Sequence, residues 1–349
     1  NLYRRNEERY SRIHHPVLLI LALFVYCRHF LNNWFYLIFI SEYALEYIND
    51  ADIHTRINTH TRIMNSFFGS LFSPVPQQPG EKIDFVYISE WFLFLSFFFV
   101  FASGFMHKFV DAKAIAKANG GSFLGAFQMT CFIPLAYVSY YGINTWYFSE
   151  HFQSSRTAEE RLFGSVSENV RKIGEVQIAF QAWDFVISLF NSELNSVEML
   201  LHHAMTGLLC YWMLTLPYMA WYGVYFMGVC ETSSLPLSVV DFMRFFPDYK
   251  EKYPLMNMIN SLLFGAFFVW FRIIKWIQFS AGAWRDSLHV LKMKKLPVPR
   301  SVVVGVLVLN VFFTALQVVW CGLLLKEAKK MFLGGGEDDK KKDEKKKKK

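Results

Sequence analysis

Two adjacent histidines stand in a segment of the chain that is otherwise apolar enough to cross a lipid bilayer. They are His202 and His203, within the run VEMLLHHAMTGLLCYW. A histidine ring can serve as a general base or as a nucleophile in acyl transfer near neutral pH. Neighbouring positions on a helix point about 100° apart, so we predict that one ring faces a cavity and the other packs. We expect His202 to be the functional ring and His203 to be a hydrogen bonder between helices.

Two polar residues at helical spacing from His202 are expected on its face of the helix. Glu198 precedes His202 by four residues, and Thr206 follows it by four, so the three side chains share one side of a helix. The Glu198 carboxylate could fix the tautomer of His202 or raise its basicity. The spacing therefore predicts that Glu198 supports His202 and that Thr206 extends the polar patch.

Three other apolar segments carry ionisable residues, which are costly inside a membrane and are therefore functional candidates. Asp184 lies in AFQAWDFVISLF, Glu231 in CETSSLPL and Arg272 in FFVWFRIIKW. We expect them to enclose a polar cavity together with the two histidines, which are the candidate catalytic residues. The alternative is that these groups only hold helices together, with Arg272 as an anchor at the membrane interface. The predicted cavity residues are Asp184, Glu198, Thr206, Glu231, Ser233, Ser234 and Arg272.

No metal or cofactor site is expected. The five cysteines lie in apolar segments without paired spacing, which is typical of small buried hydrophobic residues rather than of disulfides or thiolate ligands. A di-metal site needs more histidine and carboxylate ligands at helical spacing than these segments contain. The chain also has no Walker loop, dinucleotide fingerprint, serine elbow or zinc signature.

Composition indicates the elements that position these residues. Of the 349 residues 53% are hydrophobic and only 19% are charged, which is typical of an integral membrane protein rather than of a soluble domain. A spanning helix needs about 20 mostly apolar residues. Pro217 either separates two spans in the middle of the chain or kinks one long span. The predicted spans are residues 17–40, 84–107, 122–148, 173–190, 197–216, 217–237, 255–279 and 301–325.

The two ends of the chain differ from this apolar middle. The run SPVPQQPG, from Ser73 to Gly80, indicates a linker. The run GGGEDDKKKDEKKKKK at the C-terminus cannot bury enough apolar surface to fold. The distribution of Lys and Arg between alternate loops favours both ends on the cytoplasmic side or its organellar equivalent. The net charge of +7 favours anionic lipid surfaces or acidic protein partners, and no nucleic acid is expected.

The order of five short motifs resembles the TLC domain family, which includes ceramide synthases and translocating-chain-associating membrane proteins. The motifs are GEVQIAFQAWDF, EMLLHHAMTGLL, CETSSLPL, FFVWFRI and VLNVFFTALQVV. The resemblance implies an all-α polytopic membrane protein with a six-helix TLC bundle and one or two extra N-terminal spans. The expected division is an N-terminal extension with one span and the linker (1–80), an additional span and basic loop (81–121), the bundle (122–330) and a disordered Lys-rich tail (331–349).

The resemblance also carries expectations about chemistry. In ceramide synthases the corresponding histidine pair is implicated in acyl transfer from acyl-CoA to a sphingoid amine, so an enzyme of this kind would use His202 and His203. Their downstream motif has His-Asp and a further Asp three residues later, where this chain has Cys230, Glu231 and then Ser234. The chain is therefore closer to the branch that is not ceramide synthase. We expect it to bind, sense or modify a fatty-acyl lipid in an intramembrane polar cavity.

Three alternative functions stay open at this point. The chain could be a non-catalytic subunit of a larger membrane complex, organellar or otherwise, that binds protein partners through its N-terminal extension and Lys-rich tail. It could be a ceramide-synthase-like N-acyltransferase, or a transporter or cargo receptor that uses the cavity as a path. Membrane lipids are the expected small partners. The endoplasmic reticulum is the expected location, with a mitochondrial or other organellar membrane as the alternative.

Overall fold

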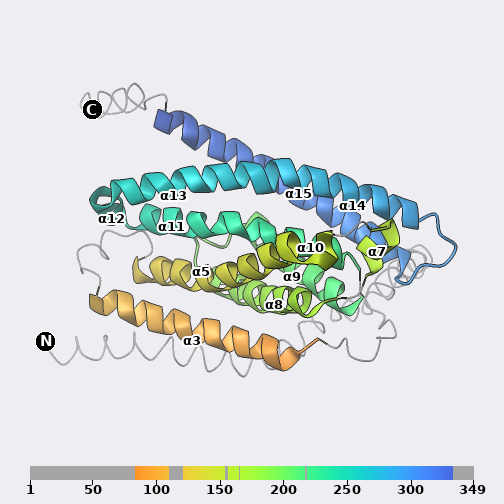
Figure 1. The fold of residues 1–349 in the computed structure, drawn as a ribbon. Helices are drawn as coiled ribbons and strands as arrows, with labels where there is room; N and C mark the ends of the chain where they lie inside the picture. Colours follow the sequence, from red (N-terminus) through yellow and green to blue (C-terminus); the bar gives the residue numbers. More distant parts are fainter. Residues whose placement is uncertain (1–82, 110–120, 154–155, 165, 217, 333–349) are drawn as a thin grey trace, which may run out of the picture. The chain divides into compact units, whose positions relative to one another are not determined.

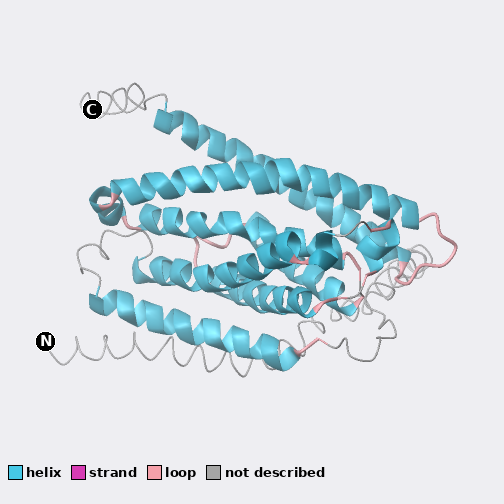
Figure 2. Ribbon diagram, viewed as in Figure 1, coloured by secondary structure: helices cyan, strands magenta, loops and turns pink. Residues whose placement is uncertain are grey.

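The structure, a computed structural model, consists of helices joined by short loops, and its described residues contain no strand (Figure 1; Figure 2). This confirms the all-α prediction. The predicted first span, the proline-rich linker and the Lys-rich tail lie outside the described residues. The residues that the structure describes are 83–109, 121–153, 156–164, 166–216 and 218–332.

Among the described residues, six long helical segments follow one another from residue 121 onward, and one more precedes them. Several of the long segments change helix type along their length, and short helices join some of them. In chain order the elements are α3 (Phe85–Phe109), α5 (Gly121–Ile143), η1 (Asn144–Phe148), α6 (Glu150–Gln153), α7 (Ala158–Phe163), α8 (Glu168–Leu189), α9 (Val197–Thr215), α10 (Ala220–Met227), η2 (Val229–Ser233), α11 (Ser234–Phe245), α12 (Pro247–Lys252), α13 (Pro254–Phe267), η3 (Phe268–Lys275), α14 (Trp276–Val290) and α15 (Arg300–Phe332).

Four of these segments are long and apolar enough to cross a membrane, by length and composition: Phe85–Lys108, Gly121–Phe148, Pro254–Val290 and Arg300–Lys329. The protein is therefore an integral membrane protein. The predicted spans that correspond to α8, α9 and α10 to α11 form helices as well, but they do not meet the same criterion. Helix α8 contains five charged residues, the two histidines lower the apolarity of α9, and the third segment is broken between its helices.

The chain reverses direction between α9 and α10. Helix α9 ends at Thr215, and α10 begins at Ala220 after Met219, whose φ of 67° lies in the left-handed region. Such a conformation is uncommon for a residue other than glycine and cannot continue a helix. The Met219 N–H donates instead to the Leu162 carbonyl, at 2.7 Å. The predicted alternative of one long kinked span is therefore wrong.

Helix α8 lies at the centre of the packing, against α3, α5 and α9. Its Trp183 is fully buried, stacks on Phe127 of α5 at a ring distance of 5.7 Å and meets the edge of Phe99 of α3 at 5.9 Å. Before α3, the backbone N–H of Asp84 donates to the Glu175 carboxylate of α8, at 2.8 Å. Helix α3 thus shares a core with the segments that follow it.

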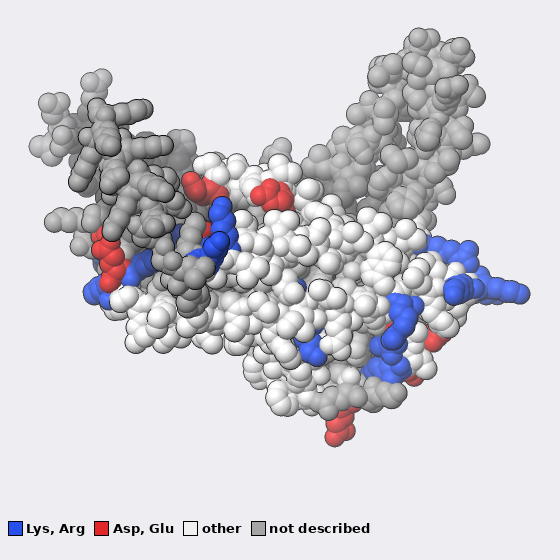
Figure 3. Space-filling view, turned by 90° about the horizontal axis from the view of Figure 1, so that it is seen from above, with Lys and Arg blue, Asp and Glu red and all other residues white. Residues whose placement is uncertain are grey.

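The outer surface of the described helices is largely apolar. On the face shown in Figure 3, charged side chains form separate patches and most of the surface is white. Large hydrophobic side chains on α13 and α15 are exposed, for example Leu255 and Val308, at 63% and 61%. A soluble protein rarely exposes so many, whereas contact with lipid accounts for them.

Two local departures from α-helix geometry position the functional groups. At the junction of α10 and η2, Gly228 lies so close to α5 that a Cβ on Gly142 would come within 2.6 Å of the Gly228 backbone. This close contact between two glycines allows the 3-10 turn η2, which carries Glu231, to pack against α5. The π-helix η3 carries Arg272, which is buried, and Lys275, which reaches outward to Gln278.

Candidate functional site

The rings of His202 and His203 leave α9 in different directions and meet different neighbours. Their centroids are 5.3 Å apart and their planes are 74° apart. His203 points toward α8, where its Nδ1 lies 2.7 Å from the Gln181 Oε1. His202 points toward α15, where its ring meets the edges of Phe313 and Trp320, at centroid distances of 5.5 and 5.4 Å. The divergence follows from the helical offset between adjacent residues.

The hydrogen bonds around His203 form a chain whose direction is set by a backbone carbonyl. A carbonyl only accepts, so the Met227 carbonyl must take a hydrogen from the Gln177 amide, at 2.8 Å. The Gln177 Oε1 then accepts from the Gln181 Nε2, at 2.9 Å. The Gln181 Oε1 is left to accept, and so His203 carries its proton on Nδ1.

The other nitrogen of His203 faces a buried carboxyl group. Its Nε2 lies 3.3 Å from Asp184 Oδ1, and the Ser188 hydroxyl donates to the same Asp184 oxygen at 2.9 Å. Asp184 is 4% exposed and His203 is 7% exposed. On this face of α9 the polar groups of His203, Gln181, Gln177 and Asp184 all have partners, as buried polar groups normally do.

His202 lines a cavity of about 60 Å³ on the opposite face of α9. Its Nδ1 is buried and has no hydrogen-bond partner. One turn later, Thr206 also lines the cavity, and its hydroxyl donates to the His202 carbonyl of its own helix, at 2.7 Å. The ring therefore lines a cavity while one of its nitrogens is buried without a protein partner, which makes His202 a candidate for contact with a ligand.

A buried ion pair forms part of the cavity wall near His202. Arg272 Nη2 lies 2.9 Å from Glu231 Oε2, and the Arg272 Nε donates to the Ser233 hydroxyl at 2.8 Å. The Ser234 hydroxyl accepts from Arg272 at 2.9 Å and donates to Glu231 at 2.7 Å. Arginine and glutamate are 7% and 8% exposed. The pair is neutral as a whole, and the hydroxyls satisfy groups that would otherwise be left unpaired.

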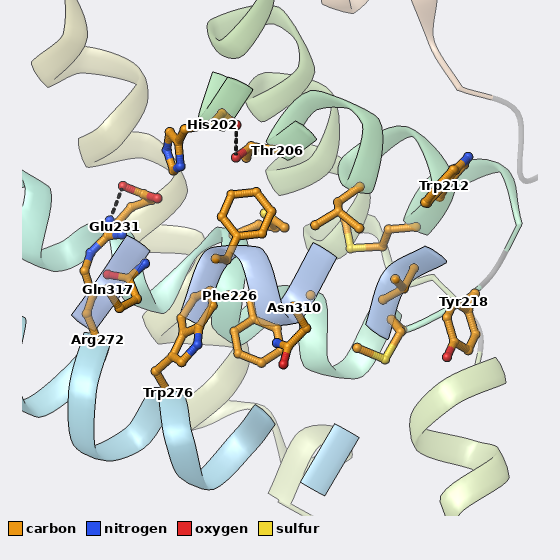
Figure 4. A pocket seen from close by; sticks show the side chains of 17 residues that line it. His202, Thr206, Trp212, Tyr218, Phe226, Glu231, Arg272, Trp276, Asn310 and Gln317 are labelled. Carbon is orange, nitrogen blue, oxygen red and sulfur yellow. Dashed lines mark hydrogen bonds and ion pairs between the residues drawn. The ribbon is translucent and has the colours of Figure 1, made fainter. Parts of the chain in front are cut away.

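Most of the polar residues of the cavity lie at one end, and Asn310 lies nearer the middle (Figure 4). Most of the remaining lining is apolar and comes from α9, α10 and α15, and Tyr218 and Trp212 lie at the far end (Figure 4). Figure 4 shows the polar group together, namely His202, Glu231, Arg272 and Gln317. The apolar part of the lining includes Leu209, Trp212, Met213, Phe226, Val306 and Phe313.

The short helix α7 lies beside Tyr218 and Met219, which line the far part of the cavity. Phe163 of α7 packs against Tyr218, with ring centroids 5.7 Å apart. The Leu162 carbonyl of α7 accepts a hydrogen bond from the Met219 N–H. Arg161 clamps α7 to α14 through two hydrogen bonds to Asp286, at 2.5 and 2.8 Å. These bonds raise the pKa of Arg161 above its usual value, so the guanidinium stays charged.

The comparisons with known proteins agree with this architecture. The TLC domain family matches residues 125–326. The chain belongs to the TLC domain family. A comparison of the whole chain with curated proteins gave no match. The TLC domain therefore contains α8, α9, the ion pair of η2 and η3, and the cavity.

The structure of the TLC domain brings only part of the predicted site together. His202, Thr206, Glu231 and Arg272 line the cavity. Ser233 and Ser234 do not line the cavity, and their hydroxyls accept hydrogen bonds from Arg272. His203 and Asp184 belong to the network between α9 and α8. Glu198 is exposed in the first turn of α9 and does not line the cavity, because α9 begins at Val197 and its first turn projects beyond the packed helices.

Two polar residues of the TLC domain were not singled out from the sequence although they lie in a quoted motif. Asn310 and Gln317 both occur in VLNVFFTALQVV, and both line the cavity from α15. Their amides interrupt the most hydrophobic of the four candidate spans, and that contrast is the signal that could have identified them. Among the described residues no group of three or more potential ligands that could hold a metal is present.

Proposed function

We propose that this TLC domain protein binds a fatty-acyl lipid, with the head group beside His202 and the acyl chain entering the apolar part of the cavity. The cavity has a volume of about 60 Å³, so the surrounding side chains must move apart to admit the chain. The observation that carries the proposal is the uneven polarity of the cavity. Apolar side chains such as Leu209 and Phe226 form most of its length, and most polar groups meet at one end (Figure 4). Asn310 lies along the length, but its amide is already bonded to Trp284 and Ser280. A ligand with one long apolar part and one small polar part fits that distribution.

The cavity supports lipid binding better than transport of a polar solute. A path for ions or polar solutes needs polar groups or water along its length. Here the segment between the polar end and Tyr218 is lined mainly by aromatic and aliphatic side chains. Desolvating a polar solute in that segment would be unfavourable, whereas an alkyl chain enters it from the lipid without losing any hydrogen bond.

Binding or sensing is also better supported than N-acyl transfer. His202 could act as a base or nucleophile, since its Nδ1 has no partner in the protein. A transferase would also need groups that stabilise the developing charge. The charged groups nearest to the cavity, Glu231 and Arg272, are already paired with each other and with two hydroxyls. We therefore propose a protein that holds its lipid and keep acyl transfer as an outcome that the experiment would detect.

The experiment compares two adjacent leucines. Leu208 and Leu209 are both partly buried against the same hydrophobic core, but only Leu209 lines the cavity. The full chain and the variants Leu209→Trp and Leu208→Trp are purified in a mild detergent, and co-purifying lipids are measured by mass spectrometry. We expect a stoichiometric acyl lipid with the wild type and Leu208→Trp and a several-fold loss with Leu209→Trp.

The same samples separate the remaining functions. Equal lipid content in the two tryptophan variants, or none in any sample, would contradict lipid binding in this cavity. Turnover of an added acyl-CoA with a long-chain amine by the wild type, lost in Leu209→Trp, would show that the protein is an N-acyltransferase instead of a binding protein.

A further inference from the structure

Gln317 is buried in the wall of the cavity without any partner for its side chain. The residue is 2% exposed, and neither its Oε1 nor its Nε2 forms a hydrogen bond. Asn310, two turns earlier on α15, is satisfied at both ends: it accepts from Trp284 at 3.0 Å and donates to Ser280 at 3.0 Å. An amide that is unsatisfied at both ends and buried is rare in a native protein.

The side chains of Gln317 and His202, which both carry buried polar atoms without partners, line the same end of the cavity (Figure 4). The His202 ring meets Phe313 and Trp320, which lie four residues before and three residues after Gln317 on α15. Positions at these spacings are neighbours on one side of a helix, so Gln317 lies between the two aromatic contacts of His202. Figure 4 shows His202 and Gln317 at the polar end, from α9 and α15.

The polar end of the cavity carries no unbalanced charge in its protein groups. The guanidinium of Arg272 is neutralised by the Glu231 carboxylate at 2.9 Å, and the Gln317 amide is neutral. A phosphate or an ionised carboxylate would enter this buried place without a free counter-charge, which is strongly unfavourable. The head group that fits is therefore neutral.

We propose that Gln317 and His202 bind the head group of an unesterified fatty acid in its neutral, protonated form; this rests on the proposed lipid binding and names the class of lipid. A carboxamide presents a donor and an acceptor side by side. A protonated carboxyl group presents the matching O–H and C=O on one side, so both Gln317 atoms are satisfied at once. The single proton of the acid is then used on Gln317, so the His202 Nδ1 meets a remaining lone pair of the head group and donates to it.

The same geometry disfavours other common lipids. Esters and thioesters have no donor for the Gln317 Oε1, which would stay unsatisfied at a cost. A trans secondary amide directs its N–H and C=O to opposite sides and cannot pair with one carboxamide at both atoms. A primary amide has the matching arrangement and shares the chemistry of the neutral acid. Water alone is the remaining occupant, because about 60 Å³ is room for a few water molecules.

The test measures binding of three ligands of equal chain length to the delipidated full chain in detergent. The probes are palmitic acid, palmitamide and methyl palmitate, and binding is followed by calorimetry and by the shift in melting temperature. We expect the acid and the primary amide to bind, and the methyl ester to bind about tenfold more weakly or less, since it leaves one Gln317 atom unpaired. Equal affinity for acid and ester would overturn the assignment of the head group.

Two glutamine variants are compared with the same ligands, so differences in ligand solubility do not affect the comparison. Gln317→Leu removes the unsatisfied amide, and Gln278→Leu makes the same change at an exposed position of α14 outside the cavity. We expect Gln317→Leu to abolish the preference for acid over ester and to raise the melting temperature of the ligand-free protein, because the buried unpaired groups are gone. We expect Gln278→Leu to change neither quantity.

The outcomes distinguish this inference from the proposed function. Binding of all three ligands alike, with Gln317→Leu unchanged and Leu209→Trp defective, would leave lipid binding in place and refute the fatty acid head group. Binding of none of the three, with Leu209→Trp indistinguishable from wild type, would refute lipid binding itself. A lower melting temperature in ligand-free Gln317→Leu would assign Gln317 a structural role and contradict the inference.

Discussion

The two faces of helix α9 treat buried polar groups in opposite ways. On the face toward α8, hydrogen bonds join His203 through Gln181 and Gln177 to the Met227 carbonyl. The His203 Nε2 contacts Asp184, which accepts from Ser188, so each of these side chains has a partner. On the face toward α15, the His202 Nδ1 and both amide atoms of Gln317 are buried and unpaired, and both residues line a cavity. The two histidines are adjacent in sequence, yet only one of them is available to a ligand.

The pairing of a buried group, and not its residue type, therefore indicates whether its role is structural or in binding. A buried network that is fully paired is costly to disturb and holds helices in one arrangement. Unpaired groups around a cavity lower the stability of the empty protein and are satisfied only when something enters. The paired face of α9 should therefore affect folding, and the unpaired face should affect binding.

The largest expected effect is the loss of Asp184, which belongs to the paired face. Asp184→Ala leaves the His203 Nε2 and the Ser188 hydroxyl without their shared partner. We expect the free energy of unfolding to fall by about 3 kcal/mol or more, as when one member of a buried pair is removed. Unfolding in mixed micelles measures the change, with Glu198→Ala, an exposed carboxylate on α9, as a control that should stay within about 0.5 kcal/mol.

A smaller effect on folding is expected from His203→Leu. The substitution leaves the Gln181 Oε1 unpaired and Asp184 with Ser188 as its remaining partner, and we expect a loss of about 1 to 3 kcal/mol of unfolding free energy. Asp184 and His203 act in one network, so the double variant should lose less than the sum of the two single losses. A double variant that loses the full sum would show that the two side chains are independent.

Binding should change without folding in His202→Leu. Its Nδ1 has no partner to leave unpaired, so we expect the unfolding free energy of the lipid-free protein to change by less than about 1 kcal/mol. Lipid retention, measured by mass spectrometry, should fall several-fold. If His202→Leu unfolded the protein as severely as His203→Leu while its folded fraction kept its lipid, the contrast between the two faces would be wrong.

The smallest effect is expected from Thr206→Val, although Thr206 is buried and lines the cavity. Its hydroxyl donates to the His202 carbonyl within α9, and valine has nearly the same shape. We expect changes below about 0.5 kcal/mol in unfolding free energy and little change in lipid content. Substantial loss of lipid in Thr206→Val would mean that the hydroxyl contacts the head group, which would extend the unpaired face by one turn.

The sequence predicted the elements and much of their content. The apolar segments within the described residues fall on helices, and the TLC domain resemblance is confirmed by the family match over residues 125–326. The polar motif CETSS and the arginine of FFVWFRI were expected near one another, and Glu231 and Arg272 do form an ion pair. Ionisable residues within apolar segments are visible in a sequence because they are rare there.

Partners across helices were harder to predict. Glu198 has the right spacing to support His202, but it lies in the first turn of α9 and is exposed. The true neighbours of His202 are Phe313 and Trp320, more than one hundred residues later. Spacing along a helix shows which residues share a face, and it does not show whether another helix covers that face.

By itself, the sequence determined that this protein is a helical membrane protein of the TLC family, and that the rings of His202 and His203 point in different directions. These results follow from composition and from helix geometry, which are local properties of the chain. Only the tertiary structure decided which ring is paired, because that depends on Gln181 from α8 and on Gln317 from α15. Pairing of buried polar groups is a property of the assembled helices, since each group finds or lacks its partner only when they pack.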